Sequence, residues 1–380
     1  MSTTDRVTER RRPPRRLLVA LAAAALVVGA CTPIADQSAS PTPAKTPDIR
    51  RSKLDIAYTA LTENDVHMVS SKKVLTDALA AVVALARQNG FKDEVATPDF
   101  QDLSEPVLAD FKKFADLVGV IAAKTPSLTP DQIGDTVLRS YTKSSPDCHT
   151  YYSPKRSGIP ASDVLAALPP QGPSDREDEA GLEFRLLPEG IGYLKWDEFL
   201  HTGTYDVTTE VRKGLDALLK QGAKAWIFDL RGNRGGDPPQ AMASWFLNGE
   251  PTLRFETRTG SAGTQNGLKD LRLPDAYQLP IVIILNGRGG SSPEHFALAL
   301  KENKRAIIVG QRSAGCLGSL SPLNLPDGSF FAVVGTEMVG AVTGTHYNNV
   351  GIPPDVPADD ASAIAVAVKT LQTEIAKRGK

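Results

Sequence analysis

Apolar residues recur at helical spacing through the first part of the chain. From about residue 53 to 146 this spacing favours helices, most clearly over 74–88, 103–124 and 128–143. The last of these segments opens with Thr129, Pro130 and Asp131, a combination typical of a helix start. We therefore predict a helical N-terminal subdomain over 53–150, and its helices carry no evident chemistry.

After residue 150 the pattern becomes one of alternating strands and helices. A hairpin is predicted over 183–196 and a helix over 206–222. Apolar strands follow at 224–230, 279–286 and 305–310, separated by helical patterns at 238–249 and 292–303. Strands that are apolar throughout are typical of a sheet covered on both faces. We therefore predict an α/β core over 186–380, joined to the helical subdomain by a connecting segment over 151–185.

The N-terminus has the pattern of an export signal. A basic stretch at 10–16 precedes an apolar run at 17–30, which is shorter than the roughly 20 residues that a membrane-spanning helix needs. The run ends in Val28-Gly29-Ala30-Cys31, which resembles the bacterial lipobox, in which the cysteine is acylated. We expect a lipoprotein signal peptide over 1–30 and lipidation of Cys31. The alternative is a plain secretory signal with an incidental cysteine.

The segment after Cys31 has the composition of a tether. Residues 31–52 are rich in Pro, Ser, Thr and Ala, and such a segment does not bury a core. Loss of residues 1–30 would leave 37 basic and 42 acidic residues of the 43 and 44 in the chain, a net charge near −5. This balance argues against a nucleic-acid partner. We expect an exported protein that is anchored to the cell membrane by its N-terminal lipid.

Several motifs occur in an order typical of one enzyme family. They are DCHT at 147–150, DLRGNRGG at 229–236, NGRGGSSPEHFALA at 286–299, RAIIVGQRSAG at 305–315 and GIPPDV at 351–356. Together they resemble peptidase family S41, the tail-specific or C-terminal processing proteases with a tricorn-like core. The resemblance implies a ClpP/crotonase-like α/β protease core that acts on peptide or protein substrates without a cofactor. Many members carry a peptide-binding PDZ domain after the histidine motif, but the connecting segment here is too short for one.

Ser291 is the expected nucleophile. It follows a predicted strand and a Gly-Gly turn and precedes a helix that starts near Pro293, so the helix N-terminus would favour a developing negative charge. The resemblance also selects Ser291, three residues before the Glu of the motif, and implies oxyanion donors in the turn of Gly235 and Gly236. The backbone amide of Ser292 is a further donor. The alternative is that Ser291 only caps the helix.

The base is less simply assigned, because Cys316 stands where many family members have a catalytic Lys. The tricorn-like branch uses a histidine, and the resemblance makes His149 the expected base, with His346 in reserve. The alternative is that His149 only fixes its loop. The family's acidic partner corresponds to Asn348, and Glu337 is a substitute for it. The remaining histidines have no evident role, and no spacing suggests a metal site.

Two cysteines remain once Cys31 is assigned to the lipid. The resemblance places Cys148 and Cys316 at the active site, and an even pair in an exported protein is typical of a disulfide. Such a bond would tie the His149 loop to the core; the alternative is two separate buried thiols. The leading function is an envelope serine peptidase. Its rivals are a non-catalytic binding lipoprotein of the same fold and a crotonase-like acyl-CoA enzyme.

Overall fold

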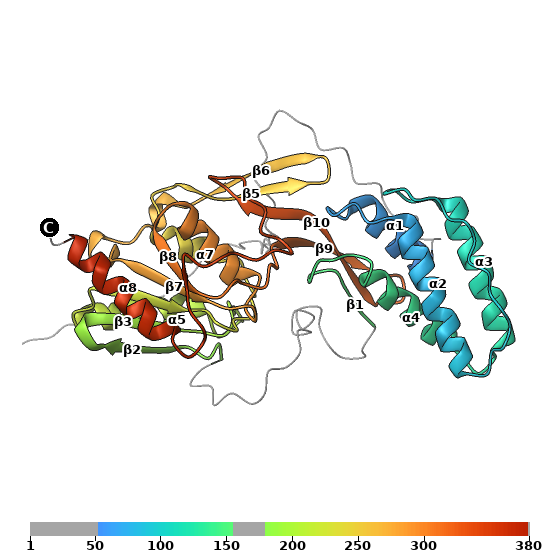
Figure 1. Ribbon diagram of the computed structural model, residues 1–380, viewed down its shortest axis with the longest axis horizontal. Coiled ribbons are helices and arrows are strands. Elements are labelled where there is room, and N and C mark those ends of the chain that lie inside the picture. Colours follow the sequence, from blue (N-terminus) through green and yellow to red (C-terminus); the bar gives the residue numbers. More distant parts are fainter. Residues whose placement is uncertain (1–51, 155–178, 379–380) are drawn as a thin grey trace, which may run out of the picture. The chain divides into compact units, whose positions relative to one another are not determined.

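The computed structural model describes residues 52–154 and 179–378 (Figure 1). The expected signal peptide, Cys31, nearly all of the tether and most of the connecting segment lie outside the described residues. Within the described ranges, no helix combines the length and the apolar character needed to cross a bilayer.

The predicted N-terminal helices are confirmed. The region contains α1 (Lys53–Asn64), α2 (Ser71–Gln88), α3 (Leu108–Lys124) and α4 (Pro130–Thr142). Helix α4 begins with a capping box, in which Thr129 and Gln132 bond each other's backbone N–H groups at 3.2 and 2.9 Å. Helix α3 begins two residues after Pro106, later than its pattern predicts. The proline ring removes a backbone donor and restricts the residue before it, so the segment ahead of Pro106 is not helical.

The α/β core is built on a six-stranded sheet. In spatial order its strands are β11 (Val356–Pro357), β8 (Ala306–Gly310), β7 (Ile281–Leu285), β4 (Ala225–Asp229), β3 (Ile191–Lys195) and β2 (Glu183–Leu187). All neighbours are parallel except the β2–β3 hairpin. The helices of the core are α5 (Val207–Lys220), α6 (Gln240–Ser244), α7 (Ser292–Glu302) and α8 (Ala363–Arg378).

Both faces of this sheet are covered, as the apolar strands predict. Successive residues of a strand point to opposite faces. Trp226 and Phe228 of β4 therefore pack with Phe296 of α7 in one apolar cluster, whereas Ile227 packs with Leu371 of α8 in another. Figure 1 shows α7 and α8 beside the sheet. The core thus holds the loop between β7 and α7 in a fixed place.

A second, antiparallel sheet was not predicted. It contains β1 (Tyr151–Ser153), β5 (Pro251–Thr257), β6 (Gly260–Asn266), β9 (Gly318–Asn324) and β10 (Phe330–Gly340), with β10 paired to β1, β5 and β9. Tyr152 of β1 and Phe331 of β10 share one hydrophobic core with the N-terminal helices. Arg258, between β5 and β6, donates to the carbonyls of Thr62, Glu63 and Ser104. The helical region is therefore packed onto the sheet that positions the segment before β1.

Candidate active site

Ser291 lies on a strained turn between β7 and α7. Its backbone has φ 71° and ψ −122°, outside the regions that a residue with a side chain normally occupies. The turn is also tight, because a Cβ on Gly289 would come 2.9 Å from the carbonyl oxygen of Leu230. Strain of this kind persists only where the surrounding structure holds it, and it gathers at functional sites. A partly exposed serine on a sharp strand-to-helix turn is the arrangement that presents a nucleophilic hydroxyl.

The buried carboxylate of Glu294 accepts hydrogen bonds that fix this turn. Glu294 is fully buried, and its oxygens accept hydrogen bonds from the N–H of Ser291 at 2.9 Å, of Gly315 at 2.6 Å and of Cys316 at 2.8 Å. The hydroxyl of Ser313 donates to it as well, at 2.5 Å. Burial raises the pKa of Glu294, and the four hydrogen bonds act in the opposite direction. The sequence pattern located Ser291 relative to Glu294 but did not predict this role.

The glycine turn after β4 lies directly against Ser291. A Cβ added to Gly235 would sit 2.8 Å from the Cβ of Ser291 and 3.2 Å from its Oγ. The N–H of Gly235 is already donated to the side chain of Asn233, at 3.0 Å. Among the described residues, the N–H groups of Gly236 and Ser292 form no hydrogen bond, and Gly236 is exposed. Of the expected oxyanion donors, Gly236 and Ser292 therefore have a free N–H, and Gly235 does not.

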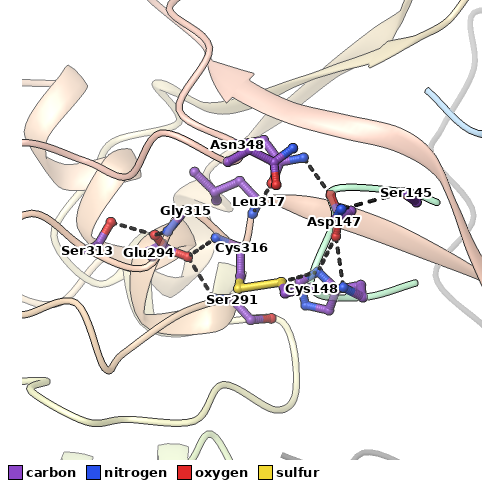
Figure 2. The surroundings of a disulfide bond; sticks show 12 residues. Ser145, Asp147, Cys148, Ser291, Glu294, Ser313, Gly315, Cys316, Leu317 and Asn348 are labelled. Atoms are coloured by element: carbon purple, nitrogen blue, oxygen red, sulfur yellow. Dashed lines mark hydrogen bonds and ion pairs between the residues drawn. A yellow bond between two sulfur atoms is a disulfide. The ribbon is translucent and has the colours of Figure 1, made fainter. Parts of the chain in front are cut away.

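A disulfide joins the segment of His149 to the neighbourhood of Ser291. Cys148 and Cys316 are bonded, with their Cα atoms 5.9 Å apart across 168 residues of sequence. This is the pairing that the sequence analysis inferred. A Cβ on Gly290 would lie 3.2 Å from the Sγ of Cys316, so the bond passes next to the residue before Ser291. Figure 2 shows Ser291 beside the two cysteines, with Asp147 above Cys148 in this view.

Asp147 is the acid that contacts His149. Its Oδ1 accepts the backbone N–H of His149 at 2.8 Å and lies 3.3 Å from the ring Nδ1. Neither of the two expected orienting residues makes this contact: Asn348 donates to Oδ2 of Asp147 at 2.6 Å, and Glu337 bonds His346 at 3.0 Å. The available signal was that Asp147 stands two residues before His149, the spacing of a carboxylate that bonds its own backbone.

Asp147 stays ionised although its side chain is fully buried. Burial alone would raise its pKa, but hydrogen bonds from His149, His67 and Asn348 hold the pKa well below its usual range. His67 was also missed by the sequence analysis, which found no role for it. The residue lies in the loop between α1 and α2, and its Nε2 is 3.2 Å from Oδ2 of Asp147. The helical region therefore contributes a side chain to the site.

The other three histidines do not contact Asp147 in the described residues. His346, the reserve base, is half exposed and bridges Glu337 and Glu256 at 3.0 and 3.3 Å. His295 is buried in α7, where burial lowers its pKa to about 3 and keeps the ring neutral. His201 is largely exposed near Asp206. In the described ranges, one close group of metal-ligand types occurs, Asp147, Cys148 and His149, and the disulfide removes its thiolate.

The fold and this site define an α/β protease core preceded by a helical region. Residues 190–358 match the model of peptidase family S41. Over 171 residues, covering 44% of this chain and 39% of the relative, the sequence is 32% identical to a carboxyl-terminal-processing protease of a Picosynechococcus species. Over 177 residues, covering 46% of this chain and 36% of the relative, it is 28% identical to the carboxy-terminal processing protease CtpA of Bacillus subtilis.

Residues 190–358 are thus similar to the core of peptidase family S41. The chain spans less than two fifths of the length of these two curated relatives. Among solved structures, a lipoprotein from Streptococcus agalactiae matches 80% of this chain and 97% of its own, with a TM-score of 0.50 and 16% identity. That likeness concerns the fold.

Proposed function

We propose that this chain is a serine peptidase of the cell envelope that hydrolyses peptide bonds through an acyl-enzyme on Ser291. The observation that carries the proposal is the strained turn at Ser291, flanked by the unpaired N–H groups of Gly236 and Ser292. A strained turn aims a hydroxyl outward, and unpaired donors beside it are what a tetrahedral oxyanion requires. The substrate is a peptide or protein.

In the proposed mechanism His149 is the general base. It takes the proton of Ser291 as Oγ attacks the scissile carbonyl carbon, and the buried charge of Asp147 stabilises the imidazolium that forms. The N–H groups of Gly236 and Ser292 donate to the oxyanion. His149 then gives its proton to the leaving amine, and a water molecule, activated in the same way, releases the acid from Ser291.

A shallow pocket beside the glycine turn offers room for a substrate side chain. It has a volume of about 160 Å³ and adjoins Gly236 through Phe199 and Asp237. Four of its lining residues are apolar and four are polar: Phe199, Leu200, Val207, Pro238, His201, Asp206, Thr208 and Asp237. This position, next to a free oxyanion donor, suits a residue of the substrate close to the scissile bond.

A fluorophosphonate probe tests the proposal. The purified protein should be labelled, Ser291→Ala should not be, and His149→Ala should be labelled about 10²–10⁴-fold more slowly. Circular dichroism and thermal melts would establish that the variants are folded. Absence of labelling of the folded wild-type protein would contradict the proposal.

The rival is a non-catalytic binding lipoprotein that keeps the fold. Two observations favour it: Cys316 takes the place of the family's Lys, and Asn348 takes the place of its Glu. A folded protein that binds peptides but never reacts with the probe would support this reading.

The envelope location rests on the N-terminal sequence. We propose that Cys31 is acylated and anchors the protein to the membrane. Metabolic labelling with radioactive palmitate should mark the wild-type chain and not Cys31→Ser. A wild-type protein that is exported without the label would indicate the plain secretory signal instead.

A further inference from the structure

The cluster around Asp147 draws side chains from three remote parts of the chain. His67 comes from the loop between α1 and α2, Asp147 and His149 precede β1, and Asn348 follows β10. Oδ1 of Asp147 faces His149, and Oδ2 faces His67 at 3.2 Å and Asn348 at 2.6 Å. Both oxygens of a fully buried carboxylate are therefore occupied, and two imidazoles share its single charge.

We propose that His67 is a positioning residue that acts on His149 through Asp147. The inference rests on the proposed function, because its target is the proposed base. It assigns the helical N-terminal region a part in the chemistry of the site. His67 itself does not touch the reacting atoms; its effect passes through the carboxylate that the two histidines share.

Donors on both oxygens hold the carboxylate of Asp147 in one orientation. A buried carboxylate stays in one orientation when donors occupy both of its oxygens. His67 and Asn348 supply the donors on one side, so the opposite oxygen stays directed at His149. Without His67, one of the two donors on Oδ2 is lost, and the carboxylate is less firmly held against the ring that it orients.

The charge of His67 also acts on Asp147. Its pKa is raised, chiefly by the hydrogen bond to Asp147. The groups that face it are Asp65 in its own loop, Asp147, Asn348 and Asn349 in the neighbouring loops, and Glu337 of β10. A protonated His67 neutralises part of the charge on Asp147. Protonation of His67 therefore weakens the support that Asp147 gives to an imidazolium at His149.

Two substitutions separate the donor from the charge. His67→Gln keeps an N–H donor without a titratable charge, whereas His67→Ala removes both. We expect His67→Gln to keep the wild-type fluorophosphonate labelling rate at high pH and to lose one of the two ionisations in the pH profile. We expect His67→Ala to be labelled at least about tenfold more slowly at every pH, a part of what a general base contributes. The control, Lys112→Gln, replaces an exposed charged side chain of α3 in the same helical region and should match the wild type.

A second measurement does not depend on activity. In proton NMR spectra, protonation of His67 should displace the ring resonance of His149 in the wild type, and this displacement should be absent in His67→Gln. Wild-type labelling profiles in both His67 variants, or the same displacement in His67→Gln, would overturn the proposal. Absence of labelling in the wild type would overturn the proposed function alone, because the NMR result would still decide the coupling.

Discussion

Glu294 and Cys316 are joined by a hydrogen bond of 2.8 Å, from the backbone N–H of the cysteine to Oε2 of the buried carboxylate. The same oxygen accepts the N–H of Ser291 at 2.9 Å. One carboxylate thus fixes both the proposed nucleophile and the residue whose disulfide holds the His149 segment. Cys316, where the sequence pattern predicts the family's lysine, is therefore held by the same buried carboxylate as Ser291.

Replacement of Glu294 by glutamine should disturb both stability and reactivity. The amide keeps the size of the side chain but turns an NH₂ group toward N–H donors, so buried donors lose their acceptor. We expect the free energy of unfolding to fall by about 2–4 kcal/mol and probe labelling to be lost. Urea denaturation and fluorophosphonate labelling are the measurements. Glu210→Gln removes a partly exposed carboxylate paired with Lys213 and should leave stability and labelling unchanged. Labelling of Glu294→Gln at the wild-type rate would contradict the proposed role of Glu294.

Two glycine substitutions separate backbone strain from contact with the nucleophile. Gly235 and Gly222 have nearly the same positive φ, 91° and 90°, so alanine costs each about 1–2 kcal/mol of conformational energy. A Cβ on Gly235 would collide with Ser291, whereas a Cβ on Gly222 meets nothing within 4 Å. We expect Gly235→Ala to abolish probe labelling and Gly222→Ala to retain it at reduced stability. Equal labelling of the two variants would show that Gly235 does not border the reactive hydroxyl.

The parts of the fold that the sequence predicts are those set by local pattern. The apolar run of β7 and the Gly-Gly turn before Ser291 are adjacent in the chain, so the sequence predicts an exposed Ser291 hydroxyl at the end of a strand. The second sheet was missed because its strands carry no comparable signal. Strand β6, over Gly260–Asn266, is polar and mostly exposed, and it exists through pairing with β5. Pairing of this kind is decided by tertiary contacts.

The same distinction applies within the site. The motif pattern predicted that Asn348 bonds the imidazole of His149. In the structure Asn348 bonds Asp147 instead, and Asp147 contacts His149. Which side chain bonds the imidazole depends on how three loops pack, and the sequence around each loop does not contain that information. His67 is the extreme case, because 80 residues separate it from its partner Asp147.

Removal of the disulfide should lower stability more than its local contacts suggest. The bond between Cys148 and Cys316 closes a loop with a sequence separation of 168 residues. In the chain-entropy model, closure of such a loop stabilises the folded state by about 5 kcal/mol. We expect the double variant with serine at both positions to melt at lower temperature and to be labelled more slowly, because the segment of His149 is no longer bonded to Cys316.

Reduced wild-type protein is the matched control for the double variant. Dithiothreitol should shift the wild-type unfolding midpoint to that of the serine pair and leave the serine pair itself unchanged. A midpoint that does not respond to the reductant, in a protein shown by mass spectrometry to be reduced, would contradict the stabilising role of the bond.

Asp147 should make the protein sensitive to acid in a defined range. Its folded-state pKa lies below the value of about 3.9 expected in the unfolded chain, so the unfolded state binds the proton more readily. The stabilisation is therefore complete above that pH and is lost as the pH falls toward the folded pKa. We expect Asp147→Asn to be less stable than the wild type at neutral pH, with the difference narrowing below about pH 4. Urea midpoints between neutral pH and pH 3 measure this. Asp99→Asn, at a fully exposed site, should have the same urea midpoint as the wild type at every pH. A difference in midpoint between the wild type and Asp147→Asn that stays constant with pH would show that the buried carboxylate is not the acid-sensitive group.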